Sequence, residues 1–282
     1  MASFGRRGFF RYVKDEHRPL PKEIFNRDDP RFGGAYMHEA LRDWVRFYRT
    51  VRAFTDHVPP GTVRVVDLGV YPGTLLRVMR GFLPRYGYRI SAYGVGLSFV
   101  SDFEDRMRAE GIELAKVNLD PARADLKPKG YPEEVPLPPA SFDAAFATEI
   151  LEHMVNPLHL LGQAFRLLKP GGRLFATTPN VTRIGSVFKL SVGRTNLDVL
   201  APVGWSNSDD EWRPHVREYD IEELRDMLRR AGFEISEAVY FDSGNTRYVA
   251  RPLSQRLVDM AKTPFYAVPH LRGNLLIVGR KP

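Results

Sequence analysis

The alternation of apolar runs with amphipathic stretches between Val63 and Val278 constrains the fold of this chain more than any other feature. Short apolar runs predict strands, and apolar residues spaced three or four positions apart predict helices. We expect strands over Val63–Leu68, Arg89–Val95, Ile112–Val117, Phe142–Ala147, Arg173–Thr178, Phe233–Phe241 and Asn274–Val278, and helices over Gly73–Tyr86, Ser98–Glu110, Asn156–Leu168 and Ile221–Ala231. Because strands and helices alternate, the sequence predicts an α/β fold, a doubly wound and mostly parallel sheet of seven strands.

The residues before this alternation form a separate element. Residues 1–35 lack a clear period and suggest an extended arm or a lid, whereas residues 36–57 have the apolar spacing of a helix. The aromatic stripe of that helix packs against the sheet in one interpretation and covers the substrate as a lid in the other. We therefore expect an N-terminal arm and helix over 1–60 and one domain over 61–282, which includes a long irregular insertion at 180–214.

Composition excludes several classes of protein. The chain has no cysteine, which excludes disulfides, thiolate metal sites and a cysteine nucleophile. It has no secretory signal pattern and no apolar run long enough to span a membrane, so we expect a cytoplasmic protein. The net charge of +7 would suit nucleic acid, but the basic residues are scattered and interleaved with acids. We therefore expect a small-molecule or glycan partner rather than nucleic acid; the oligomeric state does not follow from the sequence.

A glycine-containing turn, Asp67-Leu68-Gly69-Val70-Tyr71-Pro72-Gly73, follows the first predicted strand. Glycine at positions 69 and 73 lets the backbone turn tightly and approach a ligand closely. The turn lacks the lysine of a P-loop, and Tyr71 stands where the strict dinucleotide pattern has glycine. The turn alone therefore indicates a nucleotide-type ligand without identifying it.

Three later segments make the pattern more specific. They are Asn118-Leu119-Asp120 at the end of the third strand, the Phe-Asp pair and the Leu-Glu-His triplet within Ser141–His153, and Arg166-Leu167-Leu168-Lys169-Pro170-Gly171-Gly172 ahead of Thr178-Pro179-Asn180. With these segments, residues 60–242 resemble the class I S-adenosylmethionine (SAM)-dependent methyltransferases, which have a Rossmann-like fold.

The resemblance implies a set of SAM-binding residues. Asp67 and Gly69 would lie near the methionine part of SAM, Gly73 would permit close backbone approach, and Leu119 and Asp120 would flank the adenine. The full set of expected cofactor-binding residues is Asp67, Gly69, Tyr71, Gly73, Gly96, Leu97, Ser98, Asn118, Leu119, Asp120 and Thr148.

One position departs from the family pattern. After the second strand the family has an acidic residue that accepts hydrogen bonds from both ribose hydroxyls, and Gly96 occupies that place here. Either Ser98 or a water molecule replaces the acid, or the domain no longer binds SAM and acts as a binding module. We favour the first interpretation because the later segments are complete.

Glu149, Glu152 and His153 have the spacing i, i+3 and i+4, which places them on one face if the segment is helical. With the distant His215 they form a candidate site for Mg²⁺ or Mn²⁺. This run resembles those of ubiquinone-pathway O-methyltransferases and small-RNA 2′-O-methyltransferases, although "LEH" segments also occur in relatives without a metal. If no metal binds, His153 or His215 is the expected general base, with Glu149 beside it.

These features predict an enzyme that methylates a hydroxyl group of a small molecule or a glycan with SAM. In the insertion, Trp205, Asn207, Asp209, Asp210 and Trp212 suit stacking on a sugar, or else form an ordinary cover over the site. Arg217 would bind an anionic group of the substrate or pair with Glu218 or a helix acid. The alternative functions are RNA 2′-O-methylation and a non-catalytic binding module.

Overall fold

The computed structural model describes residues 4–19, 39–97, 99, 101–122, 130, 132–197, 215–242, 257 and 260–282. Its centre is a seven-stranded sheet in the order β3-β2-β1-β4-β5-β7-β6. The first five strands are parallel, and β7 runs antiparallel to both β5 and β6. The strands are β1 (Gly61–Leu68), β2 (Tyr88–Gly96), β3 (Ile112–Lys116), β4 (Phe142–Thr148), β5 (Leu168–Pro179), β6 (Glu234–Phe241) and β7 (Asn274–Arg280). The predicted α/β fold and its seven strands are confirmed.

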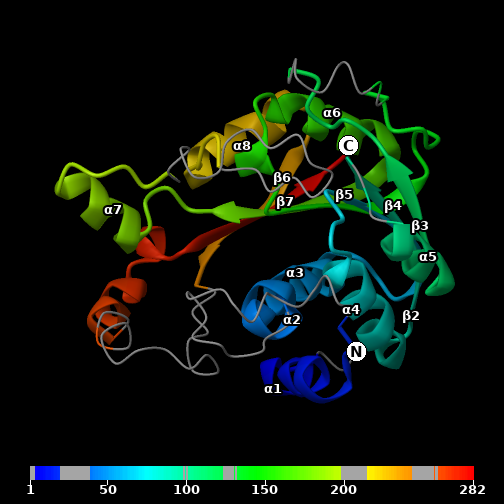
Figure 1. The fold of residues 1–282 in the computed structure, drawn as a ribbon, viewed down its shortest axis with the longest axis horizontal. Helices are drawn as coiled ribbons and strands as arrows, with labels where there is room; N and C mark the ends of the chain where they lie inside the picture. Colours follow the sequence, from blue (N-terminus) through cyan, green and yellow to red (C-terminus); the bar gives the residue numbers. More distant parts are fainter. Residues whose placement is uncertain are drawn as a thin grey trace.

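Helices cover both faces of the sheet (Figure 1). They are α1 (Arg6–Arg11), α2 (Glu39–Arg42), α3 (Trp44–His57), α4 (Thr74–Phe82), α5 (Ser101–Ala109), α6 (Pro157–Leu167), α7 (Ile184–Ser191) and α8 (Ile221–Arg230). Short 3-10 turns span Leu83–Tyr86, Leu151–His153, Thr263–Ala267 and Pro269–Leu271, and a π-helical turn spans Tyr12–Glu16. Among the described residues, no helix is both long and apolar enough to cross a bilayer.

Successive side chains of the central strands enter two different cores, as the period of a strand requires. Val65 of β1 packs in the core beneath α3, α4 and α5, whereas its neighbour Val66 packs in the core beneath α6 and α8. Phe54 of α3 lies with its ring centroid 5.9 Å from those of Phe146 and Phe175 on the sheet. The aromatic stripe of this helix therefore packs against the sheet.

Two segments differ from the sequence-based expectation. Residues 6–16 are helical rather than extended, because Phe9 finds a buried place against Phe82 of α4, with ring centroids 5.0 Å apart. The insertion at 180–214, expected to be irregular, contains α7, and its residues 198–214 lie outside the described residues. The start of α8 is as predicted, since the Asp220 side chain accepts hydrogen bonds from the amides of Glu222 and Glu223.

Candidate active site

The turn after β1 lies at the carboxyl edge of the sheet, where α/β folds place their ligands. The amides of Gly69 and Val70 both donate to the carbonyl of Val95 at the end of β2, at 2.8 and 3.0 Å. Gly69 has φ +99° and Gly73 has φ +84°, conformations that favour glycine. A side chain at Gly69 would meet Ile150, and one at Gly73 would meet Met107. Both glycines are therefore required by the turn itself.

Asp67, at the end of β1, is 3% exposed and lies opposite Gly94 of β2 and Phe146 of β4. Tyr71 is exposed, with its ring 5.2 Å from that of Phe103. Asp67 is therefore buried within the sheet, whereas the side chain of Tyr71 faces solvent. Their assignment to SAM stays a prediction.

The Phe99 ring fills the space beside Gly96. A Cβ added to Gly96 would lie 2.7 Å from Cε1 of Phe99, which is closer than packed atoms approach. An acid at position 96 would therefore displace this ring. Leu97 is half-buried, and Ser98, the expected substitute for the acid, lies outside the described residues.

Asp120 is 1% exposed, and both of its carboxylate oxygens have backbone partners. Its Oδ2 accepts from the Val155 amide at 2.8 Å and its Oδ1 from the Asn156 amide at 3.0 Å. The side chain thereby joins the end of β3 to the start of α6. Asn118 is also buried, and its Oδ1 accepts from the Asp120 amide at 3.0 Å. Any contact of Asp120 with adenine would add to this structural role.

The segment after β4 is not the helix that the i, i+3, i+4 spacing assumed. Glu149 has φ +52°, and only Leu151–His153 form a single 3-10 turn. Glu149 points toward β5, where its Oε1 accepts from the Thr177 hydroxyl at 2.9 Å. Thr148, the last residue of β4, is half-buried. The expectation of one helical face was wrong because the chain bends sharply at Glu149.

Glu152, His153 and His215 nevertheless converge. One potential ligand atom from each lies within 4.8 Å of the other two. The rings of His153 and His215 are 4.9 Å apart and nearly perpendicular. The amides of Val216 and Arg217 donate to the carbonyl oxygen of Glu152, at 2.7 and 3.2 Å, and so hold the distant His215 segment against this turn. Glu149 is not a member of this group.

The carboxylate of Glu152 is 1% exposed and accepts from the Thr178 hydroxyl at 3.0 Å. Burial and the nearby charge of Glu149 raise the pKa of Glu152 well above its usual value. A buried carboxylate of this kind is stabilised by a proton or by a cation, and two imidazoles stand beside it.

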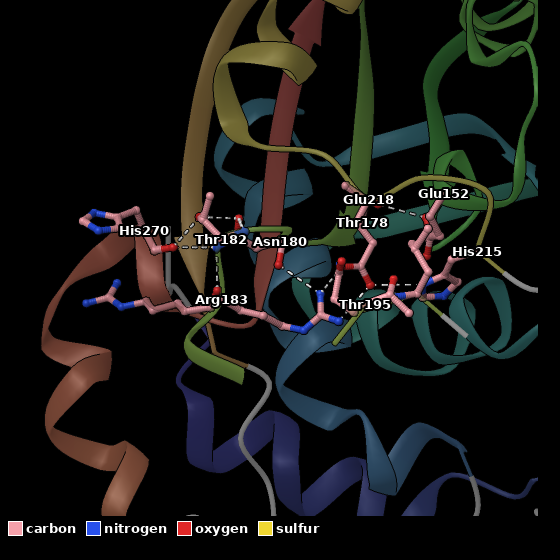
Figure 2. A network of polar contacts seen from close by, with 12 residues as sticks. Glu152, Thr178, Asn180, Thr182, Arg183, Thr195, His215, Glu218 and His270 are labelled. Carbon is pink, nitrogen blue, oxygen red and sulfur yellow. Dashed lines mark hydrogen bonds and ion pairs between the residues drawn. The ribbon is translucent and has the colours of Figure 1, made fainter. Parts of the chain in front are cut away.

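Glu218 was considered in the sequence only as a partner of Arg217, and its place in the site was missed. Its side chain is 1% exposed, yet it accepts from Arg183 at 2.5 and 2.8 Å, from Asn196 at 2.7 Å and from Nδ1 of His215 at 3.2 Å (Figure 2). Burial alone would raise the pKa of Glu218, but the hydrogen bonds from His215 and Arg183 outweigh it and lower the pKa to about 2. No sequence signal linked these residues, because Arg183 and Asn196 lie in the insertion.

Arg217 forms an ion pair with Glu223 of α8. Of the two roles expected for Arg217, the structure therefore shows the pairing with a helix acid. The residues expected to stack on a sugar, Trp205, Asn207, Asp209, Asp210 and Trp212, lie outside the described residues. The described part of the site therefore contains a glycine turn at β1, a buried acid at β3 and a carboxylate–imidazole cluster after β4.

Known proteins share both the sequence pattern and the fold. A methyltransferase domain model matches residues 33–238. The chain is 29% identical over 210 residues to a ubiquinone biosynthesis O-methyltransferase of Xylella fastidiosa, covering 74% of each chain. It is also 29% identical over 150 residues to an S-adenosylmethionine-dependent methyltransferase of Mycolicibacterium smegmatis, and this match covers 52% of the chain but only half of that relative's length.

Solved structures with this fold include a Haloferax volcanii methyltransferase in complex with the Trm112 activator, at a TM-score of 0.54 and 18% identity over 86% of this chain and 94% of that one. The [4+2]-cyclase SpnF superposes with a TM-score of 0.52 and 22% identity over 98% and 92% of the two chains. At these identities the structures show the fold alone. The family model covers most of the chain, and the chain therefore belongs to the class I SAM-dependent methyltransferases.

Proposed function

We propose that this methyltransferase transfers the methyl group of SAM to a hydroxyl oxygen of a small molecule or a sugar, next to Glu152, His153 and His215. The observation that carries the proposal is the convergence of these three side chains at the carboxyl edge of the sheet. A relative with 74% coverage of both chains is named as an O-methyltransferase, which supports the same type of acceptor.

Hydroxyl methylation needs a route for one proton. The acceptor oxygen forms a bond to the methyl carbon as the carbon–sulfur bond breaks, and the hydroxyl proton must leave to a base. The sulfonium already activates the methyl group, so the protein mainly aligns the reactants. An imidazole of His153 or His215 is the group that can take the proton.

The three side chains also fit a divalent cation. One carboxylate oxygen and two imidazole nitrogens form a mixed ligand set, which suits Mn²⁺ better than Mg²⁺ because Mg²⁺ prefers oxygen ligands. When bound there, the cation would supply positive charge that favours loss of the hydroxyl proton. Glu152 would hold it with its buried carboxylate, and Glu218 would keep the His215 ring oriented.

The nearby arginines favour a small acceptor over RNA. Arg183 is bonded to Glu218 and Arg217 to Glu223, so each cation is neutralised by a carboxylate. RNA binding would instead need a coherent row of basic side chains free to contact phosphates.

The proposal is tested with the full chain, SAM and a panel of catechol-type and sugar acceptors. Methyl transfer is expected to disappear in EDTA and to return with Mn²⁺, and Glu152→Ala should lower the rate far more than SAM affinity. Full activity in EDTA would show that no cation is required and would leave His153 or His215 as the general base. Failure to bind SAM in calorimetry would reject the enzyme itself.

A further inference from the structure

The exposed apolar side chains of this protein are concentrated at one edge of the molecule. Among the described residues, twelve large apolar side chains are exposed, and eight of them lie in α7, in the turn after it, or in the segment that leads to β7. These eight, here called the apolar edge, are Val187, Phe188, Leu190, Val192, Leu257, Met260, Phe265 and Val268. Phe188 and Met260 protrude most, with 66% and 69% of their surfaces exposed. Such a concentration marks an interaction surface rather than random exposure.

The two parts of the apolar edge form one surface although they are far apart in sequence. Asn180, just before α7, donates from Nδ2 to the carbonyls of His270 and Arg272 at 2.8 and 2.7 Å. The Thr182 hydroxyl donates to the same His270 carbonyl at 2.6 Å (Figure 2). A cavity of about 710 Å³ lies between the two parts and is lined by side chains of both, among them Phe188 and Phe265. Figure 1 shows that α7 and the segment leading to β7 project from the same end of the sheet.

Basic residues outnumber acidic ones in the two stretches that form this surface. Residues 184–197 contain Lys189 and Arg194 and no acid, and residues 257–273 contain Lys262, Arg272 and one acid, Asp259. Lys189 and Lys262 both line the cavity between the two parts. The surface therefore combines protruding apolar side chains with basic ones, and the two stretches together carry a net positive charge.

This combination discriminates between the possible occupants. A second copy of the chain bound through the same surface would bring like charges together, because a two-fold interface contacts itself. A protein partner would need a shape that matches protruding side chains. A lipid bilayer needs no such match, since it accepts apolar side chains at the level of the acyl chains and basic ones at anionic headgroups.

We propose that the apolar edge docks on an anionic lipid bilayer, with Phe188 and Met260 inserted and Lys189, Arg194 and Lys262 at the headgroups. This inference concerns a surface distinct from the carboxylate–imidazole cluster and does not depend on the methyl acceptor. Each basic side chain near an anionic surface favours binding, and the inserted apolar side chains add to it.

The test is flotation of the full chain with vesicles of phosphatidylcholine alone or mixed with phosphatidylglycerol. We expect binding to the mixed vesicles that weakens with salt, and little binding to phosphatidylcholine alone. The double variant Phe188→Ser/Met260→Ser should lose about tenfold or more of the binding, since it removes the inserted groups. Leu158→Ser is the matched control, because Leu158 is also exposed but lies on α6.

Thermal unfolding checks that the variants are folded, and Lys189→Glu/Lys262→Glu provides a second variant that tests the charges alone. Wild-type protein that does not float with the mixed vesicles would overturn the proposal, as would a double variant that floats like wild type. A dimer in sedimentation that is lost in the double variant, together with no flotation, would show self-association instead and overturn it as well.

Discussion

The Oε1 atom of Glu218 lies 3.2 Å from Nδ1 of His215, and this contact sets the direction of the His215 ring. With a pKa of about 2, Glu218 is a carboxylate at neutral pH and can only accept hydrogen bonds. In the neutral imidazole of His215, the proton that faces this carboxylate sits on Nδ1, which leaves the lone pair of Nε2 for a cation or a substrate proton.

Glu218→Gln tests this orienting role. The amide can donate as well as accept, so it no longer fixes the His215 tautomer, and we expect Mn²⁺ affinity or the methyl-transfer rate to fall about 10- to 100-fold. Glu222→Gln is the control, since Glu222 is an exposed acid of α8 paired with Arg225. Manganese titration and steady-state kinetics measure the effect. Equal behaviour of the two variants would show that Glu218 does not orient the ring.

The lowered pKa of Glu218 also predicts how the free energy of unfolding changes at acidic pH. Its pKa falls from 4.5 in the unfolded chain to about 2 in the folded protein, so the folded state favours the ionised form. The resulting stabilisation, roughly 3 kcal/mol, is fully present above about pH 4.5 and is lost as the pH falls toward 2.

Urea unfolding of wild type and Glu218→Gln at a series of pH values measures this contribution. The difference in unfolding free energy between the two proteins should be largest near neutral pH and should shrink between pH 4.5 and 2, where Glu218 becomes protonated. A difference that stays constant over this range would mean that the carboxylate is not the source of the stabilisation.

The sheet was predictable because its central strands, such as β4 and β7, are buried on both faces and therefore stand out as apolar runs. Val65 and Val66 enter different cores, so a polar residue at either position would be costly, and both positions are therefore apolar in the sequence. Strand ends were less certain. β5 begins at Leu168, five residues before the predicted Arg173, because Lys169 to Gly172 continue the strand past a glycine at φ +78°.

The candidate site was only partly predictable, because its side chains meet through long-range contacts. Glu152 and His153 are adjacent in sequence, but His215 reaches them through hydrogen bonds of its neighbours Val216 and Arg217 to the Glu152 carbonyl. The same limit explains the missed Glu218, whose partner Arg183 is 35 residues away. Spacing rules predict contacts within one helix, and the segment at Glu149 is not helical.

Asp120 provides a test that separates structure from SAM binding. Its carboxylate accepts from the amides of Val155 and Asn156, so Asp120→Ala removes both charge-assisted hydrogen bonds and should destabilise the protein by about 1–3 kcal/mol. Asp120→Asn keeps one acceptor and should cost about half as much. Chemical unfolding measures both, and calorimetry with SAM on the folded Asn variant shows whether adenine is also bound. Unchanged stability of the Ala variant would contradict the structural role.

Because the Phe99 ring occupies the space beside Gly96, we expect that an acidic residue for the ribose hydroxyls cannot be introduced at position 96 by a single substitution. A Cβ at Gly96 would lie 2.7 Å from Cε1 of Phe99, so Gly96→Asp forces the ring aside and should cost about 1–3 kcal/mol of stability without tightening SAM binding. In the Phe99→Ala background the added carboxylate has room to accept from both ribose hydroxyls, and SAM should bind more tightly to Gly96→Asp/Phe99→Ala than to Phe99→Ala alone. Thermal unfolding and calorimetry measure the two effects. Tighter SAM binding by Gly96→Asp alone would show that the ring does not control this position.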